Sequence, residues 1–299
     1  MIELKTKEIV GTQPGPHLLI TGGVHGDEFE SIAAIHRLMK LLEPAQIRGR
    51  VTLVPVVNEP AFFRGKRTAE DDLDLARTCP GDPDGSVTEQ IAHAVSSLIR
   101  TADFYIDLHT GGTEMSVLPF AGYNLHSNPD VLEQQRQMAR AFNLPIIWET
   151  FPGLDGRTLS IARDANIPAI YTEYLGGASC SPEGVDAYVD GCLNVLAHLK
   201  IIDRQQPESA VERVVEDGRP QSGHMQVCNP SPATGFFTPC VGLGDWISEG
   251  DLIGTVTDVM GQENHEIVSN QSGIVLVLHT FSRVHEGVGL AVILEIDQA

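Results

Sequence analysis

The sequence predicts an α/β protein, in which a mixed, mostly parallel sheet flanked by helices is followed by a small all-β domain. Over residues 1–202, short apolar runs rich in β-branched and aromatic residues alternate with runs of helical periodicity, as in a sheet covered by helices on both faces. Around residues 202–222 the composition turns polar, which is typical of a linker. Beyond it, short β-like runs alternate with glycine turns. We therefore expect one domain over residues 1–202 and a second over residues 203–299.

The elements of the first domain can be placed in order along the chain. The N-terminal MIELKTKEIV alternates charged and apolar residues and predicts a first strand. Apolar runs, typical of strands buried on both faces, predict interior strands at residues 17–23, 50–57, 102–109 and 167–175. Apolar residues at helical spacing predict helices at residues 28–42, 87–100, 128–142 and 181–200. In such sheets the functional side chains collect at the carboxyl ends of the strands.

The second domain resembles a known class of β domain at one turn. The stretch WISEGDLIG at residues 246–254 is similar to the turns of lipoyl-like barrels or sandwiches. The carrier domains of that class attach their prosthetic group to a lysine, and residues 201–299 contain no lysine. We therefore expect an accessory domain with a structural role or a role in forming a homo-oligomer.

Composition excludes several classes of function. The net charge is −20, from 20 basic and 40 acidic residues, which argues against a nucleic-acid partner. Apolar runs fall short of the roughly 20 residues that a membrane helix needs, and the N-terminus lacks the pattern of a signal peptide, so we expect no membrane partner and a cytoplasmic location. The five cysteines are scattered without a C-x-x-C pair, which favours reduced thiols.

Potential metal ligands follow two of the predicted strands. His25 and Glu28 lie in the loop after the strand at residues 17–23, and His109 ends the strand at residues 102–109. Two imidazoles and one carboxylate are ligands that zinc takes in catalytic sites, where one position stays open for water. A single histidine at a strand end is more often a surface or capping residue. The pairing of two such histidines with a glutamate and flanking glycines favours a site, with Asp107 beside it as a supporting partner.

Positive charge concentrates after a third strand. Residues 64–77 hold Arg64, Lys66, Arg67 and Arg77, in a chain otherwise poor in basic residues. Arginines there would suit a carboxylate or a developing oxyanion, but they would equally suit a surface loop, because acidic residues lie among them. Glu173, near the end of the strand at residues 167–175, is either a charge at the rim or a general base beside zinc-activated water.

Taken in order, these stretches resemble the succinylglutamate desuccinylase and aspartoacylase family, which is related to the zinc carboxypeptidases. The family motif G-G-x-H-G-x-E corresponds to residues 22–28, and D-x-H corresponds to residues 107–109. The region from N-P-x-A to D-L-N-R corresponds to residues 58–77, and the strand-end glutamate followed by glycine corresponds to Glu173 with the glycines after it. The resemblance extends from residue 1 to about residue 200 and implies a zinc-carboxypeptidase-like fold.

The resemblance also implies roles for individual residues. One zinc ion per chain would be bound by His25, Glu28 and His109. Glu173 would act as base and then as acid, and Arg67 would polarise the scissile carbonyl. The residues implied in substrate binding are Arg77, Asn58 and, on looser spacing, Arg157. Ala76 departs from the family pattern because it stands where D-L-N-R has asparagine, which puts the usual substrate in doubt.

The resulting hypothesis is a zinc-dependent amidohydrolase that removes an acyl group from a small N-acyl amino acid or N-acyl diamino acid. One alternative is a zinc carboxypeptidase or esterase with a larger substrate. Another is a metal-binding protein whose catalysis has lapsed, for which Ala76 is the only hint. A serine hydrolase is not supported, because the sequence contains no G-x-S-x-G motif.

Overall fold

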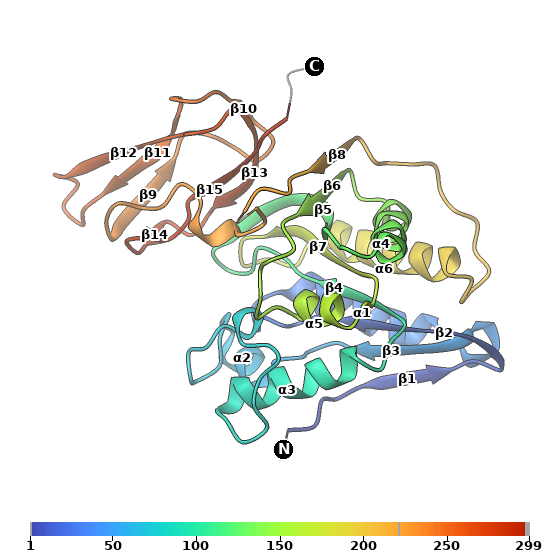
Figure 1. The fold of residues 1–299 in the computed structure, drawn as a ribbon. Coiled ribbons are helices and arrows are strands. Elements are labelled where there is room, and N and C mark those ends of the chain that lie inside the picture. The colour runs from blue at the N-terminus through green and yellow to red at the C-terminus, as the bar shows by residue number, and fades with distance from the viewer. Residues whose placement is uncertain (1, 221, 297–299) are drawn as a thin grey trace.

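The computed structural model describes residues 2–220 and 222–296, and all structural statements refer to these residues. Figure 1 shows a sheet flanked by helices and, beside it, a region built mostly of strands. The first region contains β1 (Lys7–Val10), β2 (Gln13–Thr21), α1 (Phe29–Leu41), η1 (Pro44–Gln46), β3 (Arg48–Val54), α2 (Glu59–Arg64), η2 (Leu75–Arg77), α3 (Val87–Ile99), β4 (Phe104–Leu108), β5 (Met115–Asn124), α4 (Pro129–Phe142), β6 (Ile146–Thr150), α5 (Thr158–Asp164), β7 (Ala169–Gly176) and α6 (Pro182–His198). The rest of the chain forms β8 (Arg213–Glu216), η3 (Met225–Val227), β9 (Gly235–Pro239), β10 (Trp246–Ile247), β11 (Leu252–Thr257), β12 (Asn264–Val268), β13 (Gly273–His279), β14 (Arg283–Val284) and β15 (Ala291–Leu294).

The main sheet is mixed and mostly parallel within its first region, which confirms the predicted fold class. Its strands run in the order β1-β3-β2-β4-β7-β5. The central strands β3, β2, β4 and β7 pair in parallel, whereas β1 and β5 are antiparallel to their neighbours in this order. The carboxyl ends of β2, β4 and β7 therefore lie side by side at one edge of the sheet.

Helices cover both faces of this sheet. Along β2 the side chains alternate, because Leu18 and Ile20 enter the core beneath α1, α4 and α6, while Leu19 enters the opposite core with α3 and α5. All three leucine and isoleucine side chains are fully buried. The strand is therefore apolar throughout, as the sequence predicts for a strand with two covered faces.

The sequence prediction missed the strands β5 and β6. The run that forms β5 includes Pro119 and Gly122, and the run that forms β6 spans only five residues, so neither has a strong apolar signal. β5 divides the sheet, because its residues 115–117 pair with β13 while its residues 120–124 pair with β6. The C-terminal region is thereby attached to the first half of β5.

Hydrogen bonding continues from the catalytic sheet into the C-terminal region. Within the segment predicted as a linker, β8 pairs in parallel with β6. Further along, β13 carries β10 and β15, and a separate antiparallel sheet has the order β12-β11-β9-β14. The all-β character of this region, apart from the short η3 turn, matches the prediction. The division at residue 202 stays a prediction.

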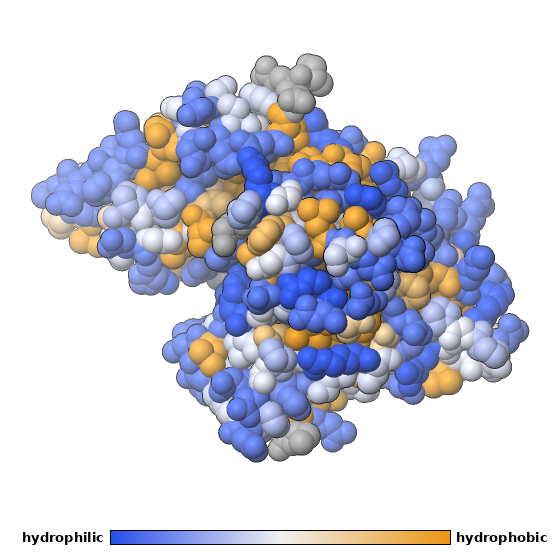
Figure 2. All heavy atoms as spheres, in the orientation of Figure 1, coloured by the Kyte–Doolittle hydropathy of each residue, from blue (hydrophilic) through white to orange (hydrophobic). Residues whose placement is uncertain are grey.

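Figure 2 shows one face of the molecule, on which hydrophilic side chains predominate and apolar residues lie among them. Among the helices of residues 2–220 and 222–296, none has the length and apolarity that crossing a bilayer would require.

Candidate active site

Two adjacent strands, β2 and β4, bring the predicted ligands to one place. His25 and Glu28 lie in the loop between β2 and α1, and His109 follows β4 directly. The loop after β2 packs against the backbone of α2, where a Cβ atom at Gly26 would lie 2.0 Å from the carbonyl carbon of Ala61. Only glycine permits this close approach, which explains why the loop contains glycine next to its histidine.

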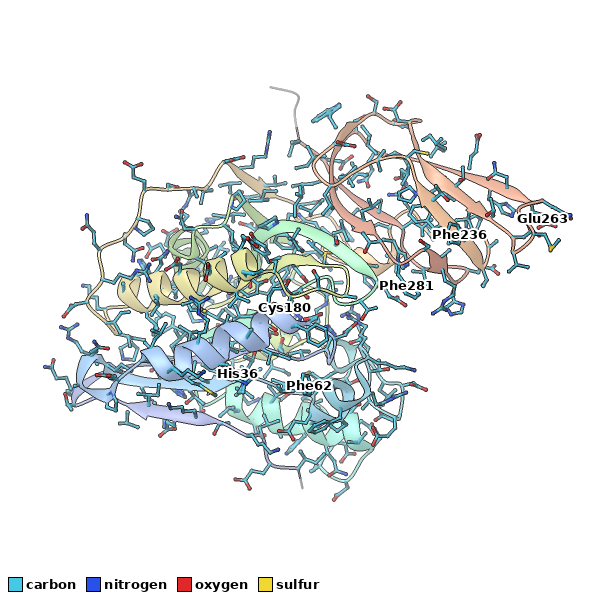
Figure 3. All side chains as sticks on the ribbon, turned by 180° about the vertical axis from the view of Figure 1, so that it is seen from behind. His36, Phe62, Cys180, Phe236, Glu263 and Phe281 are labelled. Carbon is cyan, nitrogen blue, oxygen red and sulfur yellow. The ribbon has the colours of Figure 1, made fainter. Side chains whose placement is uncertain are left out.

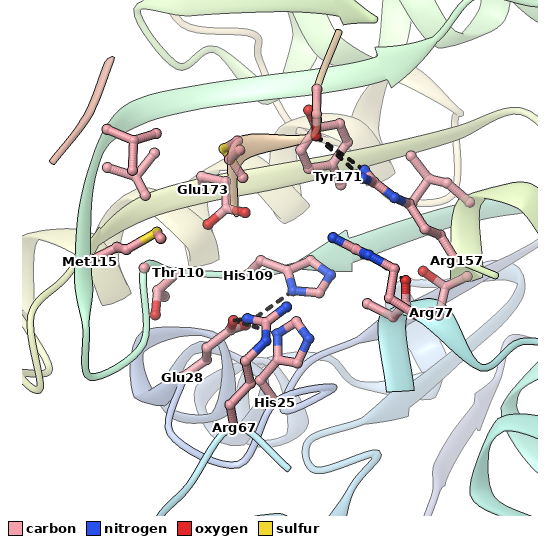
Figure 4. A pocket seen from close by; sticks show the side chains of 18 residues that line it. His25, Glu28, Arg67, Arg77, His109, Thr110, Met115, Arg157, Tyr171 and Glu173 are labelled. Carbon is pink, nitrogen blue, oxygen red and sulfur yellow. Dashed lines mark hydrogen bonds and ion pairs between the residues drawn. The ribbon is translucent and has the colours of Figure 1, made fainter. Parts of the chain in front are cut away.

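His25, Glu28 and His109 form a buried cluster with the spacing of a metal site (Figure 4). One ligand atom from each residue lies within 4.8 Å of the others. The two oxygens of Glu28 lie 2.6 Å from Nδ1 of His25 and 3.0 Å from Nδ1 of His109. The sequence-predicted ligand set is therefore brought together, although the ligands come from positions 81 residues apart in the chain.

A second carboxylate supports each imidazole on its other nitrogen. Nε2 of His25 lies 3.2 Å from Asp74, and Nε2 of His109 lies 3.0 Å from Asp107. Asp107 is itself fully buried and accepts hydrogen bonds from the hydroxyls of Thr21 and Thr158. Carboxylates placed in this way fix the orientation of a ligating histidine and direct its other nitrogen toward the metal.

The electrostatics of the cluster follow from charge pairing in a buried site. Burial favours the neutral form of Glu28, but the imidazoles of His25 and His109 hold the pKa of that carboxyl well below its usual range. Burial lowers the pKa of His109, yet Asp107 and Glu28 overcome this effect and raise the pKa well above its ordinary value. Without a metal the protons on the imidazoles balance the carboxylates around them, and a cation that displaced these protons would meet two nitrogen ligands and one carboxylate.

Glu173 lies across the cavity from these ligands (Figure 4). Its side chain is 6% exposed, and within the described part of the chain its Oε2 atom has no hydrogen-bond partner. Burial raises the pKa of Glu173 to about 8, and the imidazole of His109 opposes this shift only in part. A carboxyl group that is buried, poorly solvated and next to a potential metal site is well suited to proton transfer.

Three arginines line the same cavity. Arg67 binds Asp74 through Nε and Nη2, at 3.2 and 3.0 Å, and its Nη1 atom lies 3.9 Å from Glu28. Arg77 and Arg157 lie at the opposite end of the cavity (Figure 4), where burial, reinforced by the charge of Arg157, lowers the pKa of Arg77 to about 10. Two like charges held close together in a buried site favour an anionic ligand.

Of two positions in the family motifs, one lies away from the cavity and the other lines it. Asn58 is fully buried, and its Oδ1 atom accepts the N–H of Ala61 at 3.2 Å as the N-cap of α2. The structure does not bring Asn58 to the cavity wall, because helix capping turns its side chain into α2. Ala76, by contrast, lines the cavity, so its missing amide group directly changes the wall.

The C-terminal region contributes to the wall of the cavity. The cavity has a volume of about 80 Å³, and Gly223, Met225 and Val277 line it together with His25, Glu28 and Glu173. The guanidinium of Arg157 donates to the carbonyl of Gly223 at 3.3 and 3.4 Å, which ties this region to the site. The C-terminal region therefore narrows the space around the reacting groups.

Sequence reasoning missed several of these contributors. In the sequence, Asp74 is one of several acidic residues in a loop, although it belongs to the D-L-x-R stretch that also contains Arg77. Tyr171 and Thr158, which also line the cavity, carry no motif, and nothing in the sequence indicates that residues beyond 220 reach the site. These positions become visible only when the loops and the C-terminal region are assembled.

Comparison with known proteins identifies the family. A sequence profile of the succinylglutamate desuccinylase/aspartoacylase catalytic domain matches residues 14–199. The chain belongs to this family. The resemblance inferred from the motifs is thereby confirmed, and the expected hydrolase of the deacylase class is supported.

Relatives of this family match nearly the whole chain. The N-α-acetyl-L-2,4-diaminobutyric acid deacetylase of Halomonas elongata is 32% identical over 298 residues, which cover 97% of this chain and 85% of the relative. The product-bound structure of the ectoine utilization protein EutE (DoeB) from Ruegeria pomeroyi superposes with a TM-score of 0.87 at 29% identity, covering 96% of this chain and 87% of that one. A succinylglutamate desuccinylase/aspartoacylase structure from Rhodobacter sphaeroides gives a TM-score of 0.85 at 29% identity, covering 98% and 89%.

Proposed function

We propose that this family member is a zinc-dependent amidohydrolase that removes the acyl group from a small N-acyl diamino acid. The observation that carries the proposal is the convergence of His25, Glu28 and His109 with Glu173 and Arg67 on one narrow cavity. The division into a catalytic domain over residues 1–202 and an accessory domain over residues 203–299 that closes the cavity is part of the same proposal.

The donor set fits zinc. Two imidazoles and one carboxylate leave a coordination position open, and both imidazoles are oriented by carboxylates on their far nitrogens. His25, Glu28 and His109 would hold the ion. When bound there, zinc would lower the pKa of water and polarise an amide carbonyl.

The other residues would supply proton transfer, stabilisation of the oxyanion and binding of the substrate carboxylate. Glu173 would take a proton from the attacking water and return it to the leaving nitrogen, because its carboxyl group faces the ligands and is shielded from solvent. Arg67 would stabilise the oxyanion, since Asp74 holds its guanidinium near Glu28. Arg77 and Arg157 would bind the substrate carboxylate at the other end of the cavity.

The size of the site supports a small substrate. Residues of the C-terminal region narrow the space around the candidate metal ligands to a cavity of about 80 Å³, which supports a small group at the reacting centre. The Halomonas relative deacetylates N-α-acetyl-L-2,4-diaminobutyric acid, so an acetylated diamino acid is the first substrate that we propose. The chain retains the candidate metal ligands, Glu173 and the arginines, which argues against a metal-binding protein that has lost its catalytic activity.

The test is release of free amine from a panel of N-acyl amino acids and N-acyl diamino acids, measured with and without a metal chelator. We expect chelator-sensitive release, strongest for an acetylated diamino acid. Absence of release from protein shown to contain zinc would contradict the proposal, and so would release that a chelator leaves unchanged.

A further inference from the structure

A second and larger cavity adjoins the catalytic one. This outer chamber has a volume of about 430 Å³ and is lined by Asp27, residues 65–68, residues 111–115, Phe281 and Arg283. It shares Arg67, Gly111 and Met115 with the catalytic cavity. In Figure 3, Phe281 lies at the edge of the C-terminal region nearest to the catalytic part. A substrate in the catalytic cavity could therefore extend one of its groups into the outer chamber.

Asp27 is a buried acid in the wall of the outer chamber. Its side chain is 6% exposed, and its Oδ2 atom accepts the backbone N–H of Thr113 at 2.8 Å. The other carboxyl oxygen, Oδ1, is buried and has no hydrogen-bond partner in the described ranges 2–220 and 222–296. A buried oxygen left without a donor is costly, which points to a donor supplied by a ligand.

Among the described residues, none of the three basic side chains that line the chamber donates a hydrogen bond to Oδ1 of Asp27. The guanidinium of Arg67 is held by hydrogen bonds to Asp74, and its charge acts on Asp27 without a hydrogen bond between the two side chains. Lys66 and Arg283 are exposed at the chamber, and Arg283 lies over the ring of Phe281, 5.7 Å from its centroid. The wall of the chamber thus contains a buried carboxyl group with one oxygen that no described residue donates to, whereas Lys66 and Arg283 remain in contact with solvent.

The two ends of the combined site differ in charge. In Figure 4, Met115 and Thr110 lie on one side of the metal ligands, and Arg77 and Arg157 lie on the other. Met115 borders the outer chamber, so the arginine pair and Asp27 belong to opposite ends of the site. Such an arrangement matches a molecule with a carboxylate at one end and an ammonium group at the other.

We infer that Asp27 accepts the free ammonium group of a diamino-acid substrate and makes the enzyme prefer such substrates over N-acyl amino acids without a second amine. This inference rests on the proposed function. The amide would lie at the metal ligands, the carboxylate at Arg77 and Arg157, and the ammonium group would donate to Oδ1 of Asp27. Because the interaction is a charge-assisted hydrogen bond in a buried wall, it discriminates strongly against a methyl group at the same place.

The experiment compares two substrates that differ only in this ammonium group, N-α-acetyl-2,4-diaminobutyrate and N-acetyl-2-aminobutyrate. Both are assayed with the zinc-loaded wild type, with Asp27→Asn and with Glu70→Gln as a control that removes an exposed acid nearby. Asparagine keeps an oxygen for the N–H of Thr113 and removes the charge. Zinc content and the thermal unfolding midpoint are measured for each protein.

We expect the wild type and Glu70→Gln to prefer the diamino substrate by about tenfold or more in kcat/KM, which is the effect of a good charge-assisted hydrogen bond. Asp27→Asn should lose most of this preference, because its kcat/KM should fall for the diamino substrate and stay unchanged for N-acetyl-2-aminobutyrate. Equal losses on both substrates would show that Asp27 merely supports the loop, and equal use of both substrates by the wild type would also overturn the inference.

Two further results separate this inference from the function on which it rests. Hydrolysis of neither substrate by zinc-loaded wild type would overturn the proposed function and the inference together. Should Asp27→Asn fail to fold, calorimetric binding of 2,4-diaminobutyrate and of 2-aminobutyrate to the wild type replaces it. Tighter binding of the diamino compound supports the inference, and equal binding refutes it.

Discussion

Replacing Asp74 with asparagine should weaken zinc binding and slow the reaction, because this one carboxylate supports two functional groups. Its Oδ1 atom lies 3.2 Å from Nε2 of His25, and its Oδ2 atom lies 3.0 Å from Nη2 of Arg67. Asparagine keeps the cap on η2, where Oδ1 accepts the N–H of Ala76 at 2.9 Å, so the local backbone should persist. The substitution therefore removes charge with little change in shape.

The size of the effect follows from these contacts. A hydrogen bond to a charged group contributes about 1.5–3 kcal/mol, and loss of a carboxylate behind a ligating histidine costs about 10–100-fold in metal affinity or activity. The Asp74 side chain is 25% exposed, so solvent screening favours the lower half of this range for His25. Loss of the Arg67 contact should lower kcat further, because the guanidinium would no longer be held near Glu28.

Zinc affinity is measured by competition with a chromophoric chelator, and kcat and KM are measured on the best substrate of the panel. Asp72→Asn serves as the control, since its side chain is 78% exposed and its contact with Arg64 lies outside the cavity. If Asp74→Asn keeps both zinc affinity and kcat within about twofold of the wild type, well under the loss expected for such a partner, then the carboxylate does not position these groups.

Three other perturbations test the site and the fold. Glu173→Gln should lower kcat by about 10²–10⁴-fold, the usual contribution of a general acid–base group, while zinc content stays unchanged; unimpaired turnover with zinc bound would exclude Glu173 as the base. Removal of metal with a chelator should abolish amine release and lower the thermal midpoint, and added zinc should restore both; activity that survives verified metal removal would contradict metal dependence. Burial lowers the pKa of His17 in the folded protein, so the unfolded chain binds a proton at this imidazole more readily than the folded protein does. The contribution of His17 to stability should therefore decline as the pH falls below the ordinary histidine pKa of about 6.5. The thermal unfolding midpoint of His17→Gln should consequently change less than that of the wild type between neutral and mildly acidic pH. If the two midpoints fall in parallel as the pH is lowered, His17 does not cause this loss of stability.

The candidate metal ligands could be predicted from the sequence for a physical reason. His25, Glu28 and His109 follow short apolar runs, and parallel strands place the residues that follow them at one edge of a sheet. Glu173 was accessible in the same way, because it lies near the end of a third apolar run. Substrate-facing positions were harder to predict. The family motif places Asn58 at the site, whereas in the structure the Asn58 side chain caps α2.

The sequence by itself determined the α/β class, the all-β C-terminal region, the family and the four residues at the strand ends, because these depend on local periodicity and on short motifs. Only the tertiary structure decided that Asp74 joins His25 to Arg67 and that Gly223, Met225 and Val277 close the cavity. It alone placed Asp27 in the wall of the outer chamber. These relationships arise between segments far apart in the chain, because strand pairing such as that of β13 with β5, and the packing of loops such as those of Asp74 and His25, set which side chains meet.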